Sequence, residues 1–184
     1  VTFMEALMLQ KQAEIPTVQW SIDSTSGEIT AILSQAPKAV RLWSAHTCNT
    51  QRRDFRILNL DSPCTCGYTK GDFCINTATL WKAELLHATS QQNDGSVTYT
   101  GYKAPLGDGR WVAFFMDITF KSGYKVTSSQ TTTTHHSMNE ETLKKLGWPV
   151  TLPGTFEFTT GVSILPMTFP YEDCHGESCT GKLV

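Results

Sequence analysis

The chain has 184 residues, of which 40% are hydrophobic and 17% are charged, and its formal net charge is −2. This length is enough for one sizeable core. A slightly acidic chain has no basic surplus to neutralise a row of phosphates, so nucleic acid is excluded as an expected partner. No apolar run approaches the roughly 20 residues that a membrane-spanning helix needs.

The first predicted element is a helix over residues 1–13, because apolar residues recur there at helical spacing. The stripe comprises Phe3, Ala6, Leu7, Leu9 and Ala13. Pro16 ends the helix, since the residue before a proline is pushed towards an extended conformation. Such a helix needs a surface to pack against, which is either an upstream domain or the structure that follows it. No signal peptide is recognisable at the start.

Three segments with alternating apolar and polar residues follow, separated by turn signals, and predict consecutive β-strands. They span residues 18–23, 28–34 and 39–45. A cysteine-bearing loop comes next, and a further strand is predicted to open at residues 53–56.

Four residues at that strand opening, Arg53-Asp54-Phe55-Arg56, carry a dense set of charges. Asp54 is expected to form structural ion pairs with its arginine neighbours. In the functional alternative, Arg52, Arg53 and Arg56 contact another domain or an acidic ligand.

Six cysteines in even number indicate disulfides in an oxidising compartment. They are Cys48, Cys64, Cys66, Cys74, Cys174 and Cys179. The last two are expected to pair with each other. The first four are then left to form two bridges that pin the loop 46–76 against the strand before it.

Two alternatives remain for the first four cysteines. Their connectivity is open, except that Cys64 and Cys66 are too close in sequence to bond without strain. A zinc site is the other possibility, although C-x-C followed by C-x7-C is not the usual spacing of zinc ligands. We expect no metal and no cofactor.

The later strands are predicted at residues 79–88, 96–102, 111–120 and 155–165. The segment 79–88 also fits a helix turn, and strand is favoured by its β neighbours. The segment 111–120 is the clearest core strand, because apolar residues occupy every second position and part of the other face. Ser122 and Gly123 are expected to form a turn after it.

Residues 129–154 are interpreted as an insertion that contains a short helix near residues 139–147. His135, His136 and Glu140 lie within it and raise the question of a metal. Adjacent histidines point apart in a strand, so a solvated loop is the expected state.

Seven to nine mostly antiparallel strands predict a mainly β fold, namely an immunoglobulin-like or fibronectin-III-like β-sandwich preceded by one N-terminal helix. The predicted units are the helix over 1–15, the sandwich over 16–170 and a cysteine-closed tail over 171–184.

Several short motifs resemble, in order and spacing, the C-terminal region of the PhoPQ-activated pathogenicity-related proteins, and RDFR is the most specific of them. The motifs are IPTVQWS (15–21), VRLWSA (40–45), RDFR (53–56), GRWVAFF (109–115), FTTGV (158–162) and PMTFP (166–170). The cysteines make the chain more similar to the secreted eukaryotic branch of that family, the autocrine proliferation repressor protein A-like proteins.

The resemblance implies that an α/β-hydrolase-like domain precedes this region and holds the catalytic serine, acid and histidine. No catalytic residue is therefore expected in this chain. The resemblance implies a secreted, non-catalytic C-terminal fragment that packs on the hydrolase domain or binds a partner, with residues 1–15 as the last helix of the missing domain.

Two other functions are weighed against this one. The first is a free-standing extracellular adhesion or receptor-binding module. The second is a self-contained hydrolase that uses Ser178 and His175, since Gly176 begins a sequence like the G-x-S-x-G nucleophile elbow. Thr180 stands where the second glycine belongs, and an elbow needs a strand before it and a helix after it.

Overall fold

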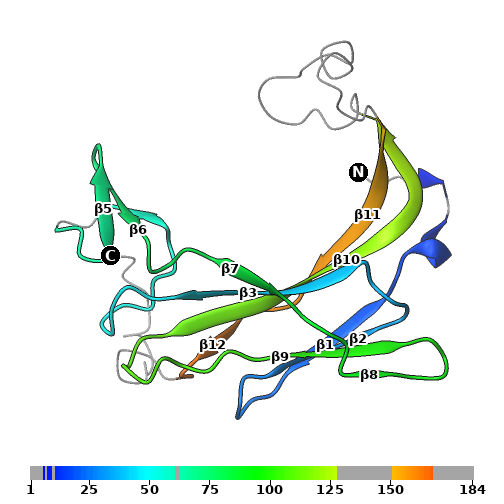
Figure 1. The fold of residues 1–184 in the computed structure, drawn as a ribbon, viewed down its shortest axis with the longest axis horizontal. Coiled ribbons are helices and arrows are strands. Elements are labelled where there is room, and N and C mark those ends of the chain that lie inside the picture. The colour runs from blue at the N-terminus through cyan, green and yellow to red at the C-terminus, as the bar shows by residue number, and fades with distance from the viewer. Residues whose placement is uncertain (1–5, 7, 10, 61–62, 128–150, 168–184) are drawn as a thin grey trace, which may run out of the picture.

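The computed structural model describes residues 6, 8, 9, 11–60, 63–127 and 151–167 (Figure 1). These residues form antiparallel β-sheets with almost no helix, which confirms the mainly β prediction. The two larger sheets lie one over the other, and a small third sheet stands to one side (Figure 1).

The first sheet has four strands in the order β1-β2-β9-β8. They are β1 (Val18–Ile22), β2 (Ile29–Leu33), β9 (Val97–Gly101) and β8 (Ser90–Gln91). Asp23 shapes the turn between β1 and β2, because its Oδ1 accepts hydrogen bonds from the amides of Thr25 and Ser26. Gly27 completes this turn with φ of 75°, a conformation that suits glycine.

The second sheet has five strands, in the order β11-β10-β3-β7 with β12 also paired to β10. They are β11 (Thr151–Thr159), β10 (Val112–Thr127), β3 (Ala39–His46), β7 (Lys82–Leu85) and β12 (Ser163–Leu165). The strand preferred over a helix turn for residues 79–88 is confirmed over Lys82–Leu85, the range of β7.

The third sheet, called the small sheet below, lies within the predicted cysteine-rich loop 46–76. Its order is β4-β6-β5, with β4 (Leu58–Asn59), β6 (Phe73–Asn76) and β5 (Gly67–Lys70). Small strands with few residues in register carry little intrinsic stability in water.

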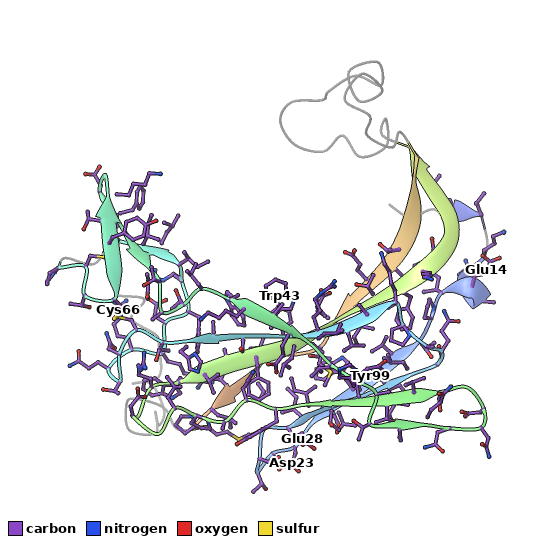
Figure 2. The ribbon with its side chains drawn as sticks, in the orientation of Figure 1. Glu14, Asp23, Glu28, Trp43, Cys66 and Tyr99 are labelled. Atoms are coloured by element: carbon purple, nitrogen blue, oxygen red, sulfur yellow. A yellow bond between two sulfur atoms is a disulfide. The ribbon has the colours of Figure 1, made fainter. Side chains whose placement is uncertain are left out.

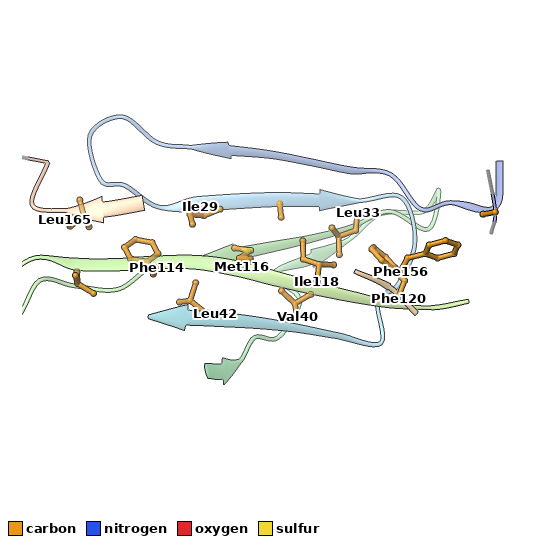
Figure 3. Packing of buried hydrophobic residues seen from close by; sticks show 13 residues of the cluster. Ile29, Leu33, Val40, Leu42, Phe114, Met116, Ile118, Phe120, Phe156 and Leu165 are labelled. Carbon is orange, nitrogen blue, oxygen red and sulfur yellow. The ribbon is translucent and has the colours of Figure 1, made fainter. Parts of the chain in front are cut away.

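One core lies between the two larger sheets (Figure 3). The strand β10 supplies five side chains that are fully buried, all from its predicted inner face: Val112, Phe114, Met116, Ile118 and Phe120. The inner face of β2 supplies Ile29, Ala31 and Leu33, also as predicted. Burying the five side chains of β10 contributes on the order of 10 kcal/mol before conformational entropy is subtracted.

The end of β10 differs from the prediction. Ser122 and Gly123 form no turn, because β10 continues to Thr127 and pairs with β11 across a register shift between Lys121 and Lys125. Residues 151–154, expected in the insertion, begin β11 instead. The pairing partner across the sheet therefore extends the strand beyond the local turn signal.

The predicted closing strand over 155–165 is two strands, β11 and β12. Thr160 interrupts it, because its Oγ1 accepts a hydrogen bond from the amide of Met116 at 3.0 Å and its own amide donates to the Met116 carbonyl. Residues 160–162 thus form a bulge opposite β10, which the alternation of apolar residues does not reveal.

Only part of the predicted N-terminal helix falls on described residues. Ala6 and Met8 have helical hydrogen bonding, and η1 (Gln12–Glu14) is a 3₁₀ turn. Ala6 belongs to the core, whereas Met8 and Leu9 are exposed. The segment therefore contacts the chain's own core through Ala6 and leaves other apolar side chains uncovered.

Candidate interdomain or partner interface

The segment between β3 and β4 is held by side chains rather than by strand pairing. Oδ1 of Asn49 accepts hydrogen bonds from the amides of Gln51 and Arg52, both at 3.0 Å. Residues 52–56 have no strand assignment, so the strand predicted to open at residue 53 is wrong. Local bonds from Asn and Asp side chains compete with the pairing of a strand and explain the difference.

Asp54 lies at the centre of an ion cluster. Its Oδ1 accepts from Nε of Arg56 at 2.9 Å, and its Oδ2 accepts from Nη2 of Arg56 at 2.6 Å. Nη2 of Arg52 lies 3.8 Å from Oδ2. The side-chain hydrogen bond from Arg56 is the main cause that lowers the pKa of Asp54. The structural ion pair predicted between Asp54 and Arg56 is confirmed.

The three predicted arginines are in different environments. Arg52 and Arg56 reach Asp54, with exposed fractions of 42% and 62% for their side chains. Arg53 is half-buried, and burial lowers its pKa. The ion cluster therefore fixes the path of this segment, while the guanidinium groups remain partly open to solvent.

An aromatic series fastens the segment to the second sheet. The ring centroids of Phe55 and Trp81 are 6.3 Å apart, and those of Trp81 and Phe115 are 5.3 Å apart. Phe115 alternates with the buried residues of β10, so it points away from the core. The RDFR segment thus packs, through Phe55 and Trp81, on the outer face of the second sheet.

The outer face of the second sheet continues across β3 and β7. Phe115 is in register with Trp43, and Trp43 is in register with Ala83. Leu85 lies on the same face and is 59% exposed. The small sheet and the distal part of the β10–β11 pair rise on the same side of the molecule as Trp43 (Figure 2). The outer face of the second sheet is therefore flanked by the small sheet at one end and by the distal part of the β10–β11 pair at the other. Its middle carries the half-exposed side chains of Trp43 and Phe115.

The small sheet presents an apolar face of its own. Leu58, Ile75 and Tyr68 are in register across its three strands, and Phe73 follows on the same face. Leu58, Tyr68 and Phe73 are each about half exposed. The opposite face carries the buried Cys74 and Asn76.

Two disulfides are present in the described residues, Cys48–Cys66 and Cys64–Cys74, with Cα–Cα distances of 5.5 and 5.3 Å. The prediction that these four cysteines form two bridges is confirmed. The zinc alternative is overturned, because each of the four sulfurs is bonded to another cysteine sulfur. Cys174 and Cys179 lie outside the described residues.

Several other sequence candidates also lie outside the described residues: His135, His136, Glu140, His175 and Ser178. His46 is described at the end of β3, and burial is the main cause that lowers its pKa. Among the described residues, no group of three or more His, Cys, Asp or Glu side chains could hold a metal ion. The same described residues form no helix with the length and apolar character needed to cross a membrane.

Sequence reasoning did not identify the series Phe55–Trp81–Phe115. A signal existed, since Phe115 is one of the apolar residues on the other face of the predicted core strand 111–120. Its apolar character alone does not show that Phe55 and Trp81 pack over it. The apolar face of the small sheet was missed because its strands are too short for a periodic pattern.

The comparisons with known proteins support the resemblance predicted from the motifs. The model of the family described as PhoPQ-activated pathogenicity-related protein matches residues 1–56. The chain is 28% identical over 189 residues to the autocrine proliferation repressor protein A of Dictyostelium discoideum, an alignment that covers 98% of this chain. The chain spans 30% of the length of that curated relative. No solved structure matches it. The predicted resemblance is thereby confirmed.

Proposed function

We propose that this chain is the non-catalytic C-terminal β-sandwich of a longer, secreted, hydrolase-like protein, and that it packs on an α/β-hydrolase-like domain of that protein. The similarity to a relative of which the chain spans 30% supports a place within a longer polypeptide. The family match over residues 1–56 supports the kinship to the PhoPQ-activated proteins.

The strand order supports an immunoglobulin-like or fibronectin-III-like sandwich. When the strands of the two larger sheets other than β12 are lettered in chain order, with β7 as C′, the first sheet reads A-B-E-D and the second reads G-F-C-C′. An immunoglobulin-type domain divides its strands between two sheets in this way. The small sheet is then an insertion between strands C and C′.

The observation that carries the docking proposal is the outer face of the second sheet. Trp43 and Phe115 remain half-exposed there, and Leu85 beside them is largely exposed. Interfaces are enriched in aromatic and arginine side chains, and Arg56 directly follows Phe55, the residue through which the RDFR segment packs on this face. The exposed Met8 and Leu9 are further apolar side chains that a neighbouring domain could cover.

The disulfides and the relative's name support secretion. Disulfides persist in oxidising compartments and are rare in the cytosol, and the relative is named as an autocrine repressor of proliferation. An extracellular location fits both observations.

The proposal is tested by hydroxyl-radical footprinting of the chain alone and within the longer protein. Labelling of Leu85 and Trp43 is expected to fall at least ~3-fold in the longer protein, because residues at the centre of an interface are desolvated. Ile32 serves as the matched control, since it is 46% exposed on the solvent face of the first sheet. Its labelling is expected to stay the same.

A substitution on the outer face of the second sheet provides a second test of the docking proposal. Leu85→Asp in the longer protein is expected to make cleavage between the two domains by a protease faster, whereas Ile32→Asp is not. Equal labelling of Leu85 in both proteins would contradict the docking proposal. It would favour the free-standing binding module, for which the apolar face of Leu58, Tyr68 and Phe73 is the supporting observation.

A further inference from the structure

The small sheet has almost no hydrophobic core. Among the described side chains between residues 57 and 80, only Cys74, Asn76 and Thr79 are buried. Two of these three are polar. Three short strands need an apolar face against a partner to be stable on their own, so hydrophobic burial cannot be the main source of order here.

Polar bonds and one disulfide hold the small sheet together internally. Oγ1 of Thr79 donates to the carbonyls of Arg56 and Asn76 at 3.0 and 3.1 Å. The amide and the hydroxyl of Thr77 both donate to the carbonyl of Cys66, at 3.0 Å each. The Cys64–Cys74 bridge joins β6 to the segment before β5. Cys66 is therefore part of the small sheet's own framework.

The other disulfide joins this framework to the two-sheet body. Thr47, next to Cys48, is fixed to the start of β10: its amide donates to the Trp111 carbonyl at 2.9 Å, and its Oγ1 accepts from the Trp111 amide at 3.1 Å. Cys48 thus belongs to the body, whereas Cys66 belongs to the small sheet. Among the described residues, their bond is the covalent tie between the two units, besides the two chain connections.

The two disulfides differ in how a thiolate can reach them. Cys48 and Cys66 are both partly exposed, so either sulfur can be attacked. In the other bridge Cys74 is only 4% exposed, so attack is open mainly at Cys64 and would release the Cys74 thiolate into a buried site. Access and the stability of the leaving thiolate both control the rate of thiol–disulfide exchange.

The surroundings of Cys48 favour it as the leaving sulfur. Nδ2 of Asn49 lies 3.9 Å from Sγ of Cys48 and can donate a hydrogen bond to a developing thiolate, which is a stronger acceptor than a disulfide sulfur. Oγ1 of Thr65 lies 3.7 Å from Sγ of Cys48 and 3.8 Å from Sγ of Cys66, so it can stabilise either thiolate and does not distinguish them.

We propose that Cys48–Cys66 is a redox-sensitive tie that a dithiol reductant opens first, releasing the small sheet from the two-sheet body while Cys64–Cys74 and the body stay intact. One thiolate of the reductant attacks Sγ of Cys66 and expels the Cys48 thiolate, which takes up a proton. The second thiol of the reductant, as its thiolate, then breaks the mixed disulfide and expels the Cys66 thiolate, which is protonated in turn. Two electrons pass to the protein, and the reductant becomes a cyclic disulfide. This proposal does not depend on the proposed function.

The test is a reduction time course of the oxidised chain with dithiothreitol, followed by alkylation and peptide mass spectrometry. Cys48 and Cys66 are expected to become alkylated at least ~10-fold faster than Cys64 and Cys74, because of the difference in access. When the first bridge is open, amides of residues 66–79 are expected to exchange hydrogen faster, and those of 112–120 are expected to keep their protection.

Two double variants provide matched controls. Cys48→Ser with Cys66→Ser is expected to reproduce the fast exchange of residues 66–79 without any reductant. Cys64→Ser with Cys74→Ser keeps the tie and is expected to retain a dithiothreitol-dependent step at Cys48 and Cys66. If either variant does not fold, the reduction time course of the wild-type chain still tests the proposal.

Three results would overturn the proposal. They are reduction of Cys64–Cys74 first, simultaneous reduction of both bridges with loss of protection in β10, and opening of Cys48–Cys66 without faster exchange in residues 66–79.

Discussion

The hydrogen bonds that Asp54 accepts from Arg56 hold the backbone in a local turn and also lower the pKa of the Asp54 carboxyl group. The amide of Arg56 donates to Oδ1 at 3.0 Å, while the guanidinium of the same residue binds both carboxylate oxygens. A residue two positions away thus satisfies the carboxylate within the segment. In the strand expected at this point, the amide of Arg56 would bond to a neighbouring strand and not to the side chain of Asp54.

Asp54→Asn is predicted to lower stability in a pH-dependent way. The pKa of Asp54 is lower in the folded chain than its ordinary value of about 3.9. Its contribution is therefore present above about pH 4 and is lost as the pH falls through the folded-state pKa. At neutral pH we expect a loss of about 1 kcal/mol in the free energy of unfolding, small because Arg56 is 62% exposed.

Urea unfolding at neutral pH and in acid, below the folded-state pKa, measures this difference. The loss should disappear in acid. Asp72→Asn is the control, since Asp72 is an exposed carboxylate in the turn between β5 and β6. An equal loss at both pH values would show that Asp54 acts through its shape and not through its charge.

Among the elements, β7 shows how an edge strand is kept from pairing with another chain. Lys82 and Glu84 are in register with the buried Ser44 and Leu42, so they occupy the inward side of the strand. Glu84 also binds Nζ of Lys103 at 2.6 Å. Inward-pointing charges on an edge strand are a common protection against edge-to-edge association.

Lys82→Val together with Glu84→Val is predicted to promote association of the chain. The double variant would present a flat apolar edge next to Leu42, which favours strand addition between copies. Size-exclusion chromatography with light scattering should detect larger species at concentrations where the wild-type chain is unchanged. Lys82→Arg with Glu84→Asp retains both charges and should behave as the wild type does. Association of that control to the same extent would refute the role given to the charges.

For the whole molecule, Ala6 determines how the N-terminal segment relates to the rest. It is fully buried in the core formed by the two larger sheets, while Met8 two residues later is 79% exposed. The segment is therefore part of the folded body at one position and open to solvent at another.

Ala6→Asp is predicted to destabilise the chain by more than about 2 kcal/mol, because an unpaired carboxyl group would enter the core. Met8→Asp is the matched control and should change the free energy of unfolding by less than about 0.5 kcal/mol. Thermal and urea unfolding of the two variants provide the measurement. Equal stability of the two would mean that the segment does not contact the core in solution.

Sequence patterns predicted the strands whose two faces differ in polarity. The segments around β2 and β3 and the inner face of β10 follow this rule, since alternation encodes burial directly. The strands β1 and β9 were also predicted, although their burial does not alternate and Trp20 of β1 is 47% exposed. The pairing of four cysteines among themselves was also within reach, because Cys174 and Cys179 were expected to pair with each other and the strain of a Cys64–Cys66 bond only narrowed the remaining connectivity.

Features that depend on contacts between distant segments were not predictable. The bulge at Thr160 needs the amide of Met116, and the length of β10 needs its pairing with β11. The candidate interface depends on Phe55, Trp81 and Phe115, which come from three separate segments. No local pattern records which aromatic residues will meet.

The sequence alone determined the mainly β character, the central core strand, the disulfide-bearing loop and the family resemblance, because each is written in local spacing or residue type. Only the tertiary structure decided that the RDFR segment is a side-chain-held loop, that it lies on the outer face of the second sheet, and that one disulfide ties the small sheet to the body. The physical reason is that these features depend on hydrogen bonds, ring contacts and covalent bonds between separate segments of the chain. No single segment shows in its own sequence which partner it will meet.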